Sequence, residues 1–236
     1  MLVIRKKQII LATLCACLSI FAFMFTTAEE PVKETVSLPV SRKNSSVRCS
    51  GMEFRMNGAQ SSNGTTEAES NLKIALKVQN LLEQSGCTVI LTRSDENAIY
   101  DIDSKTLKQK KISDIHNRVR IGNESSADIF VSIHLNKIPQ SQYYGWQTFY
   151  KDGNVDGKKL AVAIQNSLNN AIDKENNRVS KTIDNVYIIK HVEIPTTIVE
   201  CGFLSNPEEE KQLLDDTYQN RLAWGIYSGI INYFCE

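Results

Sequence analysis

The sequence lacks an excess of charge of either sign, because 27 lysine and arginine residues balance 27 aspartate and glutamate residues over 236 positions. A protein that binds nucleic acid or an acidic lipid surface through its overall charge needs a basic excess. We therefore expect no nucleic-acid partner. Internal repeats and low-complexity tracts are also lacking. With 42% hydrophobic residues, the chain is long enough to form one domain with a sizeable core.

Cysteine and histidine are both scarce. The six cysteines include no Cys-x-x-Cys spacing, so they indicate no cysteine-bound zinc, and their scatter dictates no disulfide pairing. We expect Cys87 and Cys201 to be buried apolar residues beside strands. The histidines are His116, His134 and His191. Any imidazole ligand of a metal must therefore come from residue 116 onward.

The first thirty residues have the features of an export signal. Basic residues at positions 5–7 precede an uninterrupted apolar run over residues 9–25, and small and acidic residues follow. A cleaved signal peptide and a retained membrane anchor over residues 1–28 both fit this pattern, and either places the rest of the chain outside the cytoplasm. Residues 29–48 are polar, contain two prolines and are expected to form a tether. The third predicted unit is a domain over residues 49–236.

From residue 66 onward, helical and strand-like segments alternate. Apolar residues at helical spacing and capping signals, such as Thr66 with Glu69, predict the helices. Short apolar or alternating runs predict the strands. The expected helices are at about 67–84, about 112–122, about 160–172, from Pro207 and over 222–230, and the expected strands at 87–93, 128–136, 145–151, 185–190 and 196–202.

Alternation of this kind predicts an α/β domain with a mostly parallel or mixed sheet that helices flank on both faces. Ligands of open α/β sheets bind beyond the carboxyl ends of the strands. Two of the predicted strands end in residues suited to chemistry: His134 closes "IFVSIH" and Glu200 closes "TTIVE". Strand interiors of isoleucine, valine and phenylalanine need neither residue, and an unpaired buried carboxylate is costly.

Each of these residues also has a purely structural interpretation. His134 could be a core imidazole bonded to backbone, and Glu200 could form a salt bridge with Arg93, Arg118 or Lys190. Glu67, the third candidate, complements the helix dipole in a first turn without any other role. The matching placement of His134 and Glu200 favours a shared site. With Glu67 included, the three residues provide two metal-type ligands and one base.

Five segments carry a resemblance to a known family. They are "GTTEAESNLKIA" (64–75), "LTRSDE" (91–96), "RVRIGNESSADIFVSIHLN" (118–136), "YGWQTFYK" (144–151) and "IVECGFLSNPEE" (198–209). In order and spacing they resemble the zinc-dependent N-acetylmuramoyl-L-alanine amidases of the amidase-3 type, and especially the germination-specific amidases of spore-forming bacteria. The resemblance covers about residues 62–236, and "SIHLN" together with "VECGFLSN" is specific for the family.

The resemblance implies a sheet of about six strands and hydrolysis of the amide between N-acetylmuramic acid and L-alanine, in spore-cortex maturation through muramic-lactam formation. It implies one Zn²⁺ per chain with Glu67 and His134 as ligands, and Glu200 as the catalytic carboxylate. Zinc lowers the pKa of bound water toward ~7, and a nearby carboxylate can take the proton. Arg118, Asn123 and Asn136 would support the site, or contact substrate directly. A helper protein of unknown identity is a further possible partner.

Residues 41–60 depart from the family pattern. The family's first zinc ligand is a histidine in a turn after the first strand, within about residues 44–56, where this chain has no histidine. Neither His116 nor His191 is a good substitute. For suitable codons, shifted reading frames over 44–49 and 51–56 encode Ile-Val-Val-Leu-Asp and His-Gly-Val-Pro-Asp. Frameshifts and real divergence are therefore both hypotheses for this segment.

Two functional interpretations follow. The first is an exported amidase that acts on spore-cortex or similar peptidoglycan in the cell wall or at the outer face of a membrane. The alternative is a catalytically inactive peptidoglycan-binding or regulatory protein that kept the fold and lost its metal. The absent third ligand is the feature that separates them, because a catalytic zinc usually has three protein ligands.

Overall fold

The computed structural model of the chain describes residues 61, 64, 66–95 and 97–235. The predicted export segment 1–28, the tether 29–48 and the departing segment 41–60 lie outside the described residues. The helices are α2 (Glu67–Gln84), α3 (Leu107–Glu124), α4 (Val155–Ala171), α5 (Tyr187–His191), α6 (Pro207–Leu214) and α7 (Asp216–Cys235), and the strands are β1 (Phe130–Asn136), β2 (Gln147–Tyr150), β3 (Lys181–Thr182) and β4 (Thr196–Phe203).

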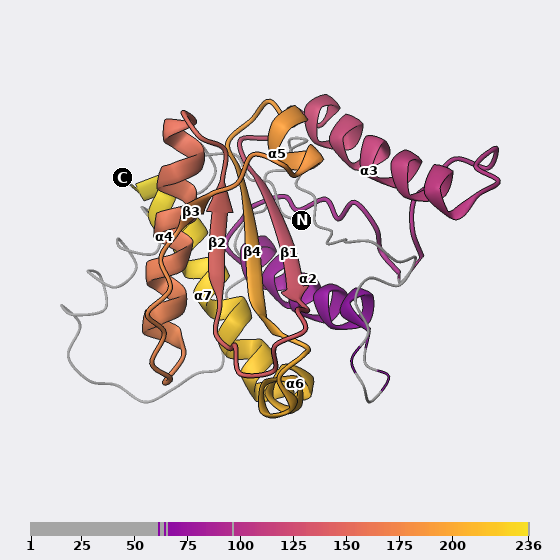
Figure 1. Cartoon of the computed structure of the whole chain (residues 1–236). Coiled ribbons are helices and arrows are strands. Elements are labelled where there is room, and N and C mark those ends of the chain that lie inside the picture. The colour runs from indigo at the N-terminus through magenta and orange to yellow at the C-terminus, as the bar shows by residue number, and fades with distance from the viewer. Residues whose placement is uncertain (1–60, 62–63, 65, 96, 236) are drawn as a thin grey trace, which may run out of the picture.

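The strands form one mixed sheet in the order β1-β4-β2-β3 (Figure 1). β1 runs parallel to β4, β4 runs antiparallel to β2, and β2 runs parallel to β3. The predicted mixed sheet with flanking helices is confirmed. The sheet has four strands in the described part of the chain, however, rather than about six.

Two expected strands account for much of this difference. Residues 87–93 are not assigned to a strand, because a strand needs a hydrogen-bonded neighbour and the first strand that the resemblance implies lies outside the described residues. The prediction of a strand over residues 185–190 was also wrong, because α5 occupies most of this run and buries Ile188 and Ile189. Short apolar runs do not separate strand from helix by periodicity. The two exposed residues of β3 carry no strand pattern and were not predicted.

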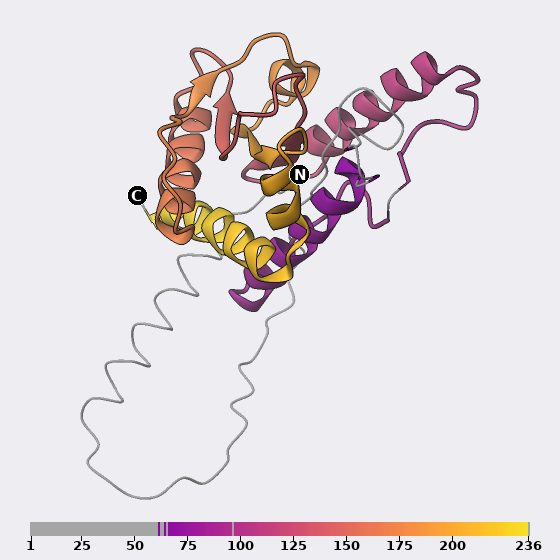
Figure 2. The same cartoon turned by 60° about the horizontal axis from the view of Figure 1, so that its bottom comes forward.

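Helices lie on both sides of the sheet. α2, α4 and α7 pack together behind it, with α7 between the other two (Figure 2). α3 approaches the opposite face, where Gly122 lies against the Phe130 ring at the start of β1. Gly229 of α7 allows close packing on α4, since an added Cβ there would lie 2.4 Å from the Ile164 Cα. The three-helix layer thus covers one face of the sheet, and α3 covers the other face near the start of β1.

The long helices follow from local signals. The side chain of Thr66 accepts a hydrogen bond from the Glu69 N–H and begins α2, as the capping pattern predicts. Asn206 does the same for α6, with Pro207 at its first position. Among the described residues, no helix is long and apolar enough to cross a membrane. The apolar run over residues 9–25 is outside that part of the chain.

Candidate active site

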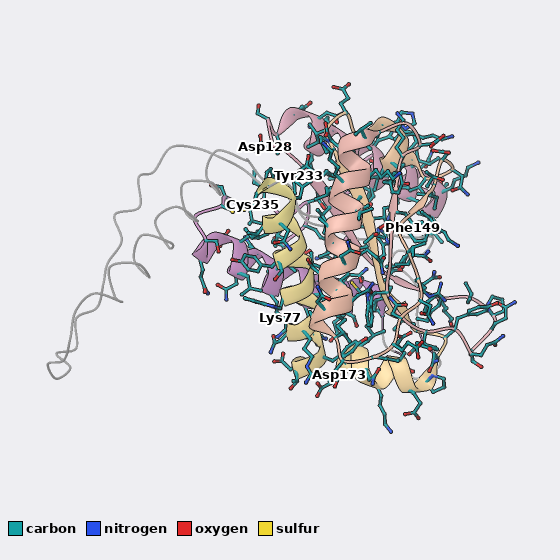
Figure 3. All side chains as sticks on the ribbon, turned by 90° about the vertical axis from the view of Figure 1, so that its left-hand side faces the viewer. Lys77, Asp128, Phe149, Asp173, Tyr233 and Cys235 are labelled. Carbon is teal, nitrogen blue, oxygen red and sulfur yellow. The ribbon has the colours of Figure 1, made fainter. Side chains whose placement is uncertain are left out.

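Three side chains form a row across the front face of the sheet. In the register of the strands, the Cα of His134 pairs with Glu200 of β4, and Glu200 pairs with Gln147 of β2. Directly paired residues point to the same face of a sheet. Phe149, two residues after Gln147, lies on the side of the sheet away from α4 and α7 (Figure 3). The row therefore faces away from the helical layer, and it brings His134 and Glu200 onto neighbouring strands of one face.

Glu67 joins this row from the start of α2. Its Oε1 lies 3.0 Å from the Nδ1 of His134 and also accepts a hydrogen bond from the Asn71 side chain at 3.1 Å. Glu67 is 1% exposed and His134 is 6% exposed, so both polar groups need hydrogen-bond partners in the interior, and each supplies one to the other. The structure therefore brings together the two residues that sequence reasoning proposed as metal ligands. Half-buried Glu200 lies on the neighbouring strand.

Ser132 is a member of the site that sequence reasoning missed. Its Oγ lies 2.7 Å from the Nε2 of His134. A histidine that uses one ring nitrogen for a metal or a carboxylate is commonly oriented through the other nitrogen. The signal was present in "SIH", because residues two apart in a strand share a face. Ser132 thus orients the imidazole toward Glu67.

The described residues do not complete a zinc site. Among them, no group of three or more histidine, cysteine, aspartate or glutamate side chains is placed to hold a metal. His116 and His191 instead stack on the ring of Tyr187, at 4.8 and 3.8 Å between ring centroids. The two predicted ligands, Glu67 and His134, therefore lie together without a third candidate among the described residues. No histidine stands among residues 1–60 to supply the third.

The residues that were expected to support the site or contact substrate make structural contacts with residues other than Glu67, His134 and Glu200. Arg118 makes two hydrogen bonds to the Asp114 carboxylate, at 2.6 and 2.9 Å, and one to Thr92. It therefore anchors α3 to the segment after α2 rather than pairing with Glu200. Asn123 accepts from the Glu193 N–H and donates to the His191 carbonyl, which fixes the segment before β4. The Asn136 carbonyl accepts from the Leu204 N–H and joins the ends of β1 and β4.

Glu209 is a buried carboxylate whose structural importance the sequence did not reveal. It accepts hydrogen bonds from the N–H groups of Gly145 at 2.7 Å and Phe203 at 2.9 Å. Burial raises the pKa of the Glu209 carboxyl, whereas these two donors and the nearby Lys174 act in the opposite direction. Gly145 has φ +88°, a conformation that glycine adopts readily. Glu209 thus ties the loop before β2 to the end of β4, beside the site.

Comparisons with known proteins bear on the family and the fold. The family described as N-acetylmuramoyl-L-alanine amidase matches residues 49–232. The germination-specific N-acetylmuramoyl-L-alanine amidase of Bacillus subtilis (strain 168) is 35% identical over 170 residues, which are 72% of this chain and 71% of that protein.

Solved structures are similar over most of the chain. The CwlD amidase from Clostridioides difficile, solved in complex with the GerS lipoprotein, has a TM-score of 0.76 and 43% identity, and the match covers 81% of this chain and 99% of that one. An N-acetylmuramoyl-L-alanine amidase from Clostridium difficile 630 has a TM-score of 0.70 and 28% identity over 81% of this chain and 97% of that one.

Proposed function

The chain belongs to the N-acetylmuramoyl-L-alanine amidase family, and we propose that it hydrolyses the amide between N-acetylmuramic acid and L-alanine in spore-cortex peptidoglycan. The observation that carries the proposal is the convergence of Glu67 and His134 next to Glu200 on one sheet face. The similarity to a germination-specific amidase supports the spore cortex as the substrate, with muramic-lactam formation as the outcome.

Glu200 is the proposed base. Its position at the carboxyl end of β4 lets it accept a proton from the water that attacks the scissile carbonyl and return it to the leaving amine. Zinc, when bound in this family, polarises the carbonyl and activates the water. Glu67 and His134 are its proposed ligands, but with two ligands in place no step is assigned to the metal.

The segment 45–56 is the place to test the proposal. We would replace Ser45–Cys49 by Ile-Val-Val-Leu-Asp and Met52–Met56 by His-Gly-Val-Pro-Asp, and call the product the restored chain. Zinc content, thermal stability and amide hydrolysis of spore-cortex peptidoglycan are then measured for the original and restored chains. A matched control carries alanine in place of the introduced histidine.

We expect the restored chain to hold about one zinc per chain and to cleave, because three protein ligands suffice for a catalytic zinc. The alanine control should cleave far more slowly. We also expect the restored chain to melt at a higher temperature, since the first strand adds apolar burial. A restored chain that holds zinc and leaves the muramoyl amide intact would contradict the proposed function. Equal melting temperatures would contradict the strand argument.

The incomplete ligand set favours a second candidate function for the chain as written. A folded protein without zinc that still binds peptidoglycan would be a non-catalytic wall-binding or regulatory protein. The same zinc measurement separates the two functions. About one tightly held zinc in the original chain would favour catalysis and would require a third ligand other than histidine from residues 1–60.

The N-terminal segment supports an exported location. We propose that residues 1–28 are an export signal or membrane anchor, that residues 29–48 form a tether, and that residues 49–236 form the amidase domain. The complex of CwlD with the GerS lipoprotein supports a helper protein as a partner here too. Cell fractionation tests the location: recovery of the chain in the cytosol would contradict it.

A further inference from the structure

Arg178 places a positive charge beside the row of site residues. Its Nη1 donates to the Gln147 Oε1 at 3.2 Å, and its Nε donates to the Tyr144 carbonyl at 2.9 Å. Gln147 is the residue whose Cα pairs with Glu200. The guanidinium group therefore lies on the same face of the sheet as Glu200, one strand further from His134.

Aromatic rings surround this charge. The guanidinium carbon lies 4.7 Å from the centroid of the Phe203 ring and 5.9 Å from that of Tyr143. Tyr143 and Tyr144 are 43% and 42% exposed, so the rings are open to a ligand from solvent. We name Tyr143, Tyr144, Arg178 and Phe203 the Arg178 rim. Apolar walls around a half-buried cation strengthen its attraction for an anion because they exclude water.

Arg178 forms no salt bridge in the described part of the chain, although its charge, like that of Lys174, counteracts the burial that raises the pKa of the Glu209 carboxyl. The salt bridges found there do not involve Arg178, whereas the nearby Lys174 lies 3.8 Å from the Glu209 carboxylate. The hydrogen bonds of the Arg178 side chain use Nε and Nη1. Guanidinium N–H groups bind carboxylates through charge-assisted hydrogen bonds, and no hydrogen bond within the described residues uses the Nη2 of Arg178.

From these contacts we propose that the Arg178 rim binds a carboxylate of the peptide stem, about two residues beyond the scissile amide. This inference rests on the proposed function, because it assigns the substrate's peptide to the side of the site beyond Glu200. The guanidinium packs on Phe203, three residues after Glu200 in β4, and three strand residues span about 10 Å, so the guanidinium lies on the order of 10 Å from Glu200. Two extended residues span about 7 Å, and an acidic side chain covers the remainder.

A purely structural role for Arg178 would have a different signature. The same hydrogen bonds fix the loop before β2. If they served structure alone, loss of the side chain would weaken binding of the acidic ligand and of its neutral amide by the same factor. A carboxylate-binding role affects acidic ligands alone. The preference between an acidic ligand and its neutral amide is therefore the readout that separates the two roles.

The test measures binding rather than hydrolysis, so that it does not depend on the zinc site. The full-length chain, in detergent, is titrated calorimetrically with N-acetylmuramoyl-L-alanyl-D-glutamate and with the same compound whose glutamate carboxylates are amides. The variants are Arg178→Gln, Arg178→Lys and the control Arg120→Gln, an exposed arginine of α3 that pairs with Glu124. Melting temperatures show whether each variant is folded.

We expect the original chain to bind the acidic ligand about 10- to 100-fold more tightly than the amide, the range for a charge-assisted hydrogen-bond pair. Arg178→Gln should abolish the preference, Arg178→Lys should keep part of it, and Arg120→Gln should keep all of it. Equal affinity of the original chain for both ligands, or no binding of the acidic one at millimolar concentration, would overturn the inference. Absence of hydrolysis alone bears only on the proposed function.

Discussion

Glu67 Oε1 and His134 Nδ1 lie 3.0 Å apart, although 67 positions separate the two residues in the chain. The contact joins the first turn of α2 to the end of β1. Both groups are buried, so each needs hydrogen-bond partners when these two elements pack, and the other group is one of them. It therefore links the stability of the domain to the geometry of the site.

We expect Glu67→Ala to lower the free energy of unfolding by about 1–3 kcal/mol, because it removes an acceptor that serves both His134 and Asn71 in the interior. Glu69→Ala is the matched control in the same helical turn. Glu69 pairs with Lys73 at the surface and should contribute less than about 1 kcal/mol. Urea denaturation measures both, and equal losses would argue against the buried pair.

The role of Glu200 predicts a selective loss of activity. In the restored chain, Glu200→Gln should lower kcat by about 10²- to 10⁴-fold, the usual contribution of a general base. Zinc content should stay unchanged, since Glu200 is not a proposed ligand. Full activity of the variant would show that another group takes the proton from water.

The buried ion pair of Asp114 and Arg118 should affect the free energy of unfolding more than any exposed ion pair does. Removing one partner leaves the other charge buried, so Asp114→Ala should cost about 3–5 kcal/mol of unfolding free energy. The double variant Asp114→Leu with Arg118→Met should recover much of this loss, because no uncompensated charge remains. Chemical denaturation of the three proteins decides the point. A double variant no more stable than Asp114→Ala would contradict it.

The cysteines should differ in reactivity. Burial raises the pKa of Cys87 to about 12 and also raises the pKa of the Cys201 thiol, so both stay protonated and shielded at neutral pH. Exposed Cys235 serves as the internal comparison. Iodoacetamide labelling of the folded chain at pH 8, read by mass spectrometry, should modify Cys235 well before the other two. Labelling of all three at one rate would contradict their burial.

Local patterns predicted the elements that depend on neighbours in the chain. α2 begins and ends where its cap and apolar stripe indicated, and α6 begins at Pro207 as expected. β1 and β4 were also anticipated, although β1 continues two residues beyond His134 and β4 three residues beyond Glu200. Caps and periodicity act over a few residues, so a sequence displays them directly.

Short runs without a distinct period were less informative. The residues of α5 are mostly apolar and β-branched or aromatic, and they formed a helical turn rather than the expected strand. Residues 87–93 have strand-like composition, yet a ladder needs a partner that lies elsewhere in the chain. In both cases the outcome depends on what packs alongside, which composition does not specify.

The sequence by itself determined the α/β class, the family and the strand-end positions of His134 and Glu200, because periodicity and motifs are properties of the chain. Only the tertiary structure decided that Glu67 meets His134, that Ser132 orients the ring and that Arg178 lies beyond Gln147. The contacts of Glu67 and of Arg178 join residues on separate elements. Ser132 and His134 lie on the same strand, but Ser132 orients the ring only because Glu67 is on its other side. Packing of α2, the sheet and the loop before β3 brings them together, and no local pattern encodes that packing.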